Sequence, residues 1–240
     1  SGPRLLFIHL WDVHFDYIPP PPYDTLYDPG YEGPVDGKGM GRFMREKPQG
    51  WTDRDLEHLK ALYDGEIRWT DDTLKQLMEL FERRGLRGQT LLAIAADHGE
   101  AFYEHGALGH THSLHEVELR IPLILHFPGV IPAGLRVEHQ AHITDIAPTL
   151  LALAGLEPFA HALGRDLSPL LLPGRAEWPE RQVVGELFDA ALGLKSAALR
   201  AQTWKLIRDY IPQRERVFDL KADPGEQAPL ENERLPLPAA

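Results

Sequence analysis

The sequence predicts an α/β fold with a partial sheet flanked by helices, followed by a small antiparallel β subdomain. Short apolar runs, typical of buried strands, alternate with stretches of helical periodicity in residues 1–174. Short half-polar runs bounded by turn residues fill residues 175–240. We therefore expect a main α/β domain at 1–174 and a C-terminal antiparallel subdomain at 175–240.

The first predicted strand is RLLFIHLWD at 4–12, which precedes the proline-rich loop IPPPPY. Residues 28–50 are rich in glycine and proline, and we expect a functional loop or lid there rather than a linker. Thr52 is a predicted N-cap, because apolar residues at helical spacing follow it. Gly85 is the predicted stop, and Gly65 is a candidate position for a bend.

The next predicted strands are TLLAIAAD at 90–97 and IPLILHF at 121–127, in a mostly parallel sheet. Thr144 is expected to cap the helix DIAPTLLALAG, which Gly155 closes. Four strands are expected in the C-terminal part, in RQVVGELF, SAALRAQ, TWKLIRDY and RERVFDL, with IPQR as a hairpin loop.

Composition excludes several classes of function. The net charge of −11 argues against nonspecific nucleic-acid binding, but a local metal or cation still permits a small anionic substrate. The chain has no cysteine, so it holds neither a disulfide nor a cysteine nucleophile. Its longest apolar runs are too short to span a bilayer.

The segment AIAADHGEAFYEHGALGHTHSLHE (93–116) holds five of the twelve histidines. Asp97 and His98 follow a predicted strand, at the edge where catalytic groups of open α/β sheets gather, and Gly99 permits a sharp turn there. A carboxylate beside an imidazole suits a divalent cation. The alternative is that Asp97 caps a helix and the histidines are solvated.

Longer stretches in consistent order resemble the sulfatases of the alkaline phosphatase superfamily. They are FIHLWDVHFDYIPPPPY, YDGEIRWTDDTLKQLMELFERRG, ADHGE, GHTHSLHEVELRIPLILHFPG, HITDIAPTLLALAG, WKLI and VFDLKADPGEQAPL. The resemblance covers nearly the whole chain and implies a partial alkaline-phosphatase-like sheet. ADHG alone also fits phosphomutases and nucleotide pyrophosphatases of the superfamily.

The resemblance implies roles for five residues. Asp97 and His98 match the second pair of metal ligands, and His14 matches the histidine that contacts the sulfate ester and helps to protonate the leaving oxygen. His110 falls near the position that contacts sulfate from the other side. Because the motif reads GHTH rather than GHG, His112 is a rival for that role. A surface role is the alternative for His14, and we expect His105 and His115 to be structural or solvent-facing.

Two parts of the family pattern are not found in these residues. There is no strand ending in the first acidic ligand pair, and no Cys/Ser-x-Pro-x-Arg segment of the kind that yields the formylglycine nucleophile. Asp71 and Asp72 lie on a predicted helix and are no substitute. We therefore expect the chain to be the C-terminal part of a longer protein, with roughly 150–250 residues upstream. We also expect weak metal binding, an exposed apolar edge and self-association.

The resemblance predicts hydrolysis of a small anionic sulfate ester with a divalent metal, most readily Ca²⁺, with Mn²⁺ or Zn²⁺ as alternatives. We expect the 240 residues alone to be inactive. The alternatives are a phosphodiester or phosphonate monoester hydrolase of the same superfamily, and a non-catalytic binding or assembly module. The compartment stays open between cytoplasm and periplasm, since any export signal is expected upstream.

Overall fold

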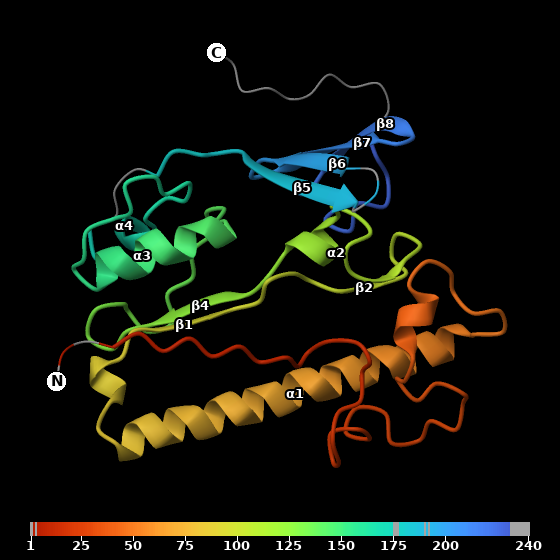
Figure 1. The fold of residues 1–240 in the computed structure, drawn as a ribbon, viewed down its shortest axis with the longest axis horizontal. Coiled ribbons are helices and arrows are strands. Elements are labelled where there is room, and N and C mark those ends of the chain that lie inside the picture. The colour runs from red at the N-terminus through yellow and green to blue at the C-terminus, as the bar shows by residue number, and fades with distance from the viewer. Residues whose placement is uncertain (1, 3, 175–177, 190, 192, 231–240) are drawn as a thin grey trace. The chain divides into compact units, whose positions relative to one another are not determined.

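The computed structural model describes residues 2, 4–174, 178–189, 191 and 193–230 (Figure 1). They form two compact units, each of which is described by itself. The first unit comprises residues 1–85 and 102–109, and the second comprises 86–101 and 110–240. The predicted boundary between 174 and 175 adjoins residues 175–177, which lie outside the described residues, so it stays a prediction.

The main element of the first unit is the helix α1 (Asp53–Arg83) (Figure 1). Thr52 is its N-cap, as predicted, and forms a capping box with Asp55. The helix ends before Gly85, which has a positive φ of 64°. It continues through Gly65, the candidate position for a bend, where a Cβ would overlap the carbonyl oxygen of Tyr23. The glycine therefore admits a neighbouring loop rather than bending the helix.

The core of the first unit lies between α1 and the loops around it. Its buried residues are Tyr17, Val35, Met40, Leu59, Leu62, Phe102 and Leu108. Phe102 and Leu108 come from a short hairpin of β2 (Ala101–Phe102) and β3 (Leu108–Gly109). Burial of these apolar side chains is the main force that holds the irregular N-terminal segment on the helix.

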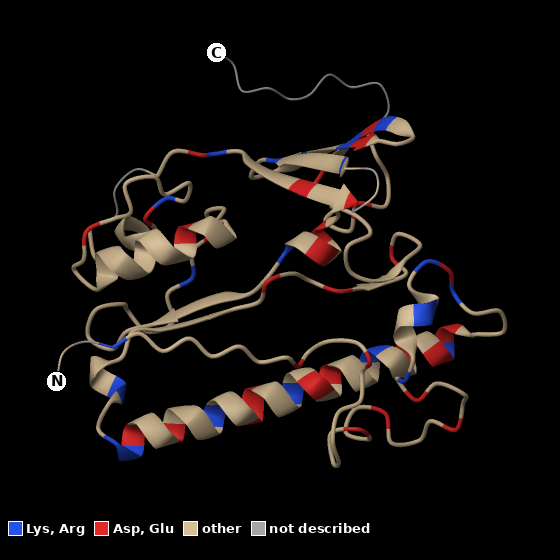
Figure 2. Ribbon diagram, in the orientation of Figure 1, with Lys and Arg blue, Asp and Glu red and all other residues tan. Residues whose placement is uncertain are grey.

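The loop at 28–50 contains one short 3-10 helix, η1 (Met40–Phe43), and is otherwise irregular. Polar contacts attach it to α1. The carboxylate of Asp28 accepts hydrogen bonds from Arg54 at 2.6 and 2.5 Å and lies 2.8 Å from Nδ1 of His58. Tyr31 donates to Asp55. The loop is therefore fastened to the N-terminal half of the helix. Along α1, Figure 2 shows acidic and basic residues interspersed.

The predicted strand at 4–12 is wrong. Within the described residues this segment belongs to no sheet, and Leu5, Phe7 and Trp11 are 91%, 84% and 70% exposed. Its composition is that of a strand, but a strand also needs a partner for its backbone hydrogen bonds.

Two short strands open the second unit, after the 3-10 turn η2 (Arg87–Gln89). They are β1 (Leu92–Ala95) and β4 (Leu123–His126), both at the predicted positions. They pair antiparallel, with Ala93 opposite Leu125. The expectation of a mostly parallel sheet is therefore wrong for the described strands, because every pairing of known register is antiparallel.

Three helices follow in the second unit: α2 (Glu116–Leu119), α3 (Ile146–Leu153) and α4 (Ser168–Leu171). The 3-10 turn η3 (Ile143–Asp145) precedes α3, and its N-cap is His142. The prediction that Thr144 caps α3 is wrong, because Thr144 lies inside η3 and the N-cap of α3 is Asp145. No helix of the described part of the chain is long and apolar enough to cross a membrane.

The predicted C-terminal sheet is present as a four-stranded antiparallel meander (Figure 1). Its strands are β5 (Val183–Asp189), β6 (Gly193–Arg200), β7 (Trp204–Tyr210) and β8 (Gln213–Asp219), in that order across the sheet. Leu114 packs with Ala198, Ile207 and Phe218 in a small core. This core places the histidine segment on the sheet.

Candidate active site

The turn that follows β1 carries Asp97 and His98. The Asp97 side chain is 79% exposed and that of His98 is 35% exposed. Nδ1 of His98 lies 2.8 Å from the carbonyl oxygen of Gly99, to which it donates. That hydrogen bond leaves Nε2 with its lone pair, 3.7 Å from Oδ2 of Asp97. Two ligand atoms of the kind that metals bind thus lie side by side.

This geometry fits a divalent cation. Metal–ligand distances of about 2.0–2.6 Å place neighbouring ligand atoms about 3–4 Å apart, which includes the observed 3.7 Å. The carbonyl that holds Nδ1 is the usual outer partner of a metal-bound histidine. Ca²⁺ prefers oxygen ligands, so the imidazole nitrogen weighs toward Zn²⁺ or Mn²⁺. Two ligands alone give incomplete coordination.

His110 lies against His98, with ring centroids 3.9 Å apart and planes at 30°. Its Nδ1 lies 2.9 Å from Oε1 of Glu100, whose side chain is 3% exposed. The hydrogen bond to Glu100 raises the pKa of His110 above its ordinary value of 6.5, against the opposing effect of burial. The imidazole therefore gains cationic character, which suits contact with an anionic group.

The backbone of His112 is held on both sides. Its N–H donates to Oε2 of Glu118 at 3.1 Å, and its carbonyl accepts from Nζ of Lys195 at 3.2 Å. The side chain is half-buried. His110 makes a ring contact with His98, and the choice between His110 and His112 as the sulfate contact stays a prediction.

Helix α2 packs against the turn that carries Asp97 and His98. The backbone N–H of Gly99 donates to the carbonyl of Glu118 at 2.7 Å. A Cβ at Gly99 would overlap the carbonyl oxygen of Val117, so only glycine permits this close approach. The carboxylate of Glu118 also accepts from Oγ of Ser113 at 2.6 Å. The turn, the histidine segment and α2 are thereby joined.

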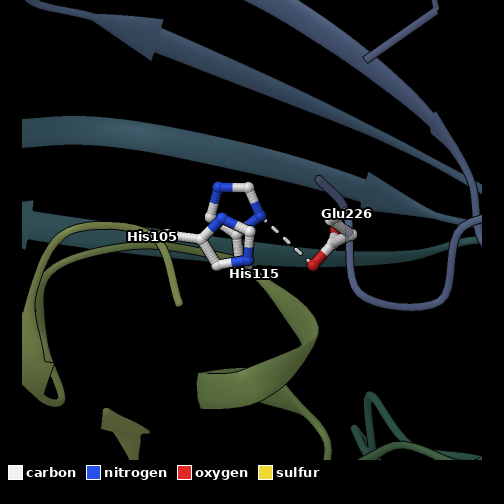
Figure 3. Close-up of side chains that lie close together, drawn as sticks. All are labelled: His105, His115 and Glu226. Carbon is white, nitrogen blue, oxygen red and sulfur yellow. Dashed lines mark ion pairs between the residues drawn. The ribbon is translucent and has the colours of Figure 1, made fainter. Parts of the chain in front are cut away.

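His115 precedes α2 as its N-cap residue and is 2% exposed. Its Nδ1 lies 3.2 Å from Oε2 of Glu226. Figure 3 marks this ion pair with a dashed line. Nζ of the fully buried Lys205 lies 2.6 Å from Oε1 of the same carboxylate. These contacts hold His115 at the start of α2, and its expected structural role stays a prediction. His105 belongs to the first unit and is half-buried.

His14 also belongs to the first unit, whereas Asp97, His98, His110 and His112 belong to the second. Its Nδ1 lies 2.6 Å from the carbonyl oxygen of Phe15, and its ring stacks on that of Phe15 at 4.4 Å. The side chain is half-buried. A role for His14 at the substrate stays a prediction.

Sequence reasoning missed Glu100, Lys205 and Glu226. Glu100 directly follows the Asp-His-Gly turn, and its place in ADHGE was the available signal. Glu226 lies in the polar segment KADPGEQ, which has the composition of a surface turn. Only the structure shows that it is buried.

Comparisons with known proteins agree along most of the chain. The family model described as "Sulfatase" matches residues 1–156. A second model, "N-sulphoglucosamine sulphohydrolase, C-terminal", matches residues 103–235.

The individual relatives share between a quarter and a third of their aligned residues with this chain. Arylsulfatase K of Bos taurus is 28% identical over 192 residues, which cover 73% of this chain and 34% of that protein. Choline-sulfatase of Rhizobium meliloti is 29% identical over 193 residues, which cover 79% and 36%. The crystal structure of the phosphonate monoester hydrolase of Agrobacterium radiobacter matches with a TM-score of 0.66 and 29% identity, covering 75% of this chain and 38% of that one. The chain thus spans about a third of the length of these curated relatives.

Proposed function

The chain belongs to the sulfatase family, and from that premise we propose that it supplies the second half of a metal-dependent active site that hydrolyses sulfate monoesters. Asp97 and His98 are the proposed metal ligands, and His110 is the proposed contact for the sulfate group. The observation that carries the proposal is the 3.7 Å separation of Asp97 Oδ2 and His98 Nε2, at a turn where Gly99 orients the imidazole.

Each residue has a distinct task in this proposal. A bound divalent metal would act as a Lewis acid on the sulfuryl oxygens. Asp97 contributes negative charge, and His98 presents Nε2 because Nδ1 is occupied. Glu100 holds His110 by its Nδ1 and favours the imidazolium, which stabilises negative charge on the ester oxygens. His112 is the alternative for this contact, and His14 is the proposed proton donor to the leaving oxygen.

The nucleophile is not assigned to these residues. The 240 residues contain no cysteine and no Ser-x-Pro-x-Arg segment, so the expected formylglycine has no precursor among them. We propose that this chain alone binds metal weakly and does not turn over sulfate esters. Turnover would need a protein that also carries the nucleophile and the first acidic ligand pair.

Metal titration of the 240-residue chain tests the site directly. Calorimetry with Ca²⁺, Mn²⁺ and Zn²⁺ should show one weak site, which Asp97→Asn and His98→Ala each remove. Asp71→Asn is the matched control, because Asp71 is an exposed helical acid with a side chain 69% exposed. Equal binding by Asp97→Asn and the wild type would refute the assignment.

A phosphonate monoester or phosphodiester hydrolase is the second candidate. It is favoured by the 29% identity to the Agrobacterium radiobacter hydrolase and by a histidine in the ligand pair. A longer protein that carries both this chain and a nucleophile should be assayed in parallel with an aryl sulfate, an aryl phosphodiester and an aryl phosphonate. The substrate with the highest kcat/KM decides between the two reactions. Activity on none of them, with metal bound, would favour a non-catalytic module.

A further inference from the structure

We propose that Glu226 is a positioning residue for the metal-binding turn, and that it acts through α2 from a buried ion pair on the C-terminal sheet. This rests on the proposed function for the identity of the metal ligands. The mechanical connection itself rests only on contacts within the second unit.

The connection begins at the buried ion pair of Lys205 and Glu226, which we call the anchor. Lys205 in β7 is 0% exposed, and its Nζ lies 2.6 Å from Glu226 and 3.0 Å from Oε1 of Glu116. The side chain of Glu226 is 1% exposed. A buried ion pair of this kind is costly to separate, because each charge would lose its nearest counter-charge at a site that water does not reach. Both groups therefore have a single favourable position.

The second step joins the anchor to α2. Oε2 of Glu226 accepts the backbone N–H of Glu116 at 2.5 Å and lies 3.2 Å from Nδ1 of His115. Those two residues are the first residue of α2 and its N-cap. Arg200 of β6 adds a second tie, with Nη2 3.2 Å from the Glu116 carboxylate. The start of this one-turn helix is thus fixed to the sheet at the backbone and at the side chain.

The third step joins α2 to the site. The helix has only four residues, so a displacement of its first residue moves its last turn as well. Its Glu118 carbonyl holds the N–H of Gly99 at 2.7 Å, and Val117 fills the space beside Gly99. Gly99 in turn supplies the carbonyl that orients His98. The path from the Glu226 carboxylate to His98 is therefore continuous.

The test compares Glu226→Gln with Glu215→Gln. Both residues belong to the second unit, but Glu215 is an exposed acid whose side chain is 55% exposed. We expect Glu226→Gln to weaken metal binding about threefold to tenfold, less than the loss of a direct outer-shell partner. Glu215→Gln should bind metal as the wild type does.

Amide hydrogen exchange by NMR separates positioning from general destabilisation. In Glu226→Gln the Gly99 amide should exchange about threefold to tenfold faster. The Leu220 amide, which donates to Thr203 at 2.8 Å in the same unit, should keep its wild-type rate. If Glu226→Gln does not fold, Glu226→Asp is the second variant. It keeps a negative charge beside Lys205, but its shorter side chain does not reach the Glu116 N–H. It should show the same selective change in exchange at Gly99.

The outcomes are distinguishable. The positioning role would be overturned if the Gly99 amide exchanges at the wild-type rate in folded Glu226→Gln or Glu226→Asp. It would also be overturned if exchange at Gly99 and Leu220 is accelerated equally in both variants. Absence of metal binding by the wild type would instead overturn the proposed function, while the exchange rates still test the connection. If the wild type binds metal and Glu226→Gln binds it equally well, Glu226 does not position the ligands, although the connection to Gly99 can still hold.

Discussion

Replacing Gly99 with alanine would place a methyl group against α2. An ideal Cβ there overlaps the carbonyl oxygen of Val117 and lies 3.1 Å from its carbonyl carbon and 3.3 Å from that of Glu118. These are backbone atoms, which cannot turn away as a flexible side chain can. The turn and α2 must therefore separate, and the 2.7 Å hydrogen bond between Gly99 and Glu118 is lost.

The cost follows from these two effects. Overpacking of this kind costs about 1–3 kcal/mol, and the lost hydrogen bond costs about 0.5–1.5 kcal/mol. Together they lower the free energy of unfolding by about 2–4 kcal/mol, a large part of the stability of an ordinary domain. With a urea m-value of about 2 kcal/mol/M, the midpoint should fall by about 1–2 M. Metal affinity should fall with it, because Gly99 also orients His98.

Urea unfolding followed by circular dichroism measures the midpoint, and calorimetry measures the metal affinity. Gly88→Ala is the matched control, since a Cβ at Gly88 meets no atom within 4 Å. It should unfold near the wild-type midpoint. If Gly99→Ala unfolds within 0.3 M of Gly88→Ala (about 0.6 kcal/mol at the m-value above) and binds metal equally well, the close approach of α2 to the turn is not a constraint on the site.

Three further predictions follow from other parts of the structure. Thr52→Ala removes the side-chain cap of α1 and should destabilise the first unit by about 1 kcal/mol, seen as a lower thermal midpoint. Burial would raise the pKa of Glu116 and of Glu226. The Lys205 charge nevertheless holds the pKa of Glu116 below the ordinary 4.5, and the hydrogen bond from His115 together with the Lys205 charge does the same for Glu226. Their contribution to stability is therefore complete above pH 4.5 and is lost as the pH falls through the lower pKa values of the folded state. In a profile of urea midpoint against pH from 7 to 3, Glu226→Gln should flatten the acidic part. The exposed segment at 5–11 should drive self-association at high concentration, which Phe7→Glu reduces; light scattering that shows a monomeric wild type would contradict this.

The elements with local determinants could be predicted from the sequence. Helix α1 carries its own cap at Thr52, its own apolar periodicity and its own stop at Gly85, and it was predicted almost to its ends. The positions of β1 and β4 followed from their apolar composition. Their antiparallel pairing did not, because composition names no partner. The segment at 4–12 shows the same limit, since its residues favour a strand that no described neighbour completes.

In the candidate site, too, neighbouring residues could be predicted from the sequence and long-range contacts could not. Asp97 and His98 could be proposed from the sequence because both follow one strand and stand next to each other. The support for that pair could not be found, because Glu226 contacts Glu116 across 110 positions. Its burial and its pairing with Lys205 depend on how the C-terminal sheet packs. The two proposed ligands are therefore neighbours in the sequence, whereas the residues that support them come from distant segments.

The separation of Glu116 and Glu226 also sets an order of events during synthesis. A ribosome adds about 5–20 residues per second, so Glu226 follows Glu116, 110 positions earlier, by about 5–20 s. During that interval α2 lacks its buried carboxylate. Lys205 is made 89 positions after Glu116 and has only Glu116 as a partner among these acids until Glu226 follows. The turn at Asp97 and His98 is therefore synthesised before Glu226, which supports it through α2. If the turn binds a metal as proposed, its support by Glu226 should be complete only after the C-terminal sheet has formed.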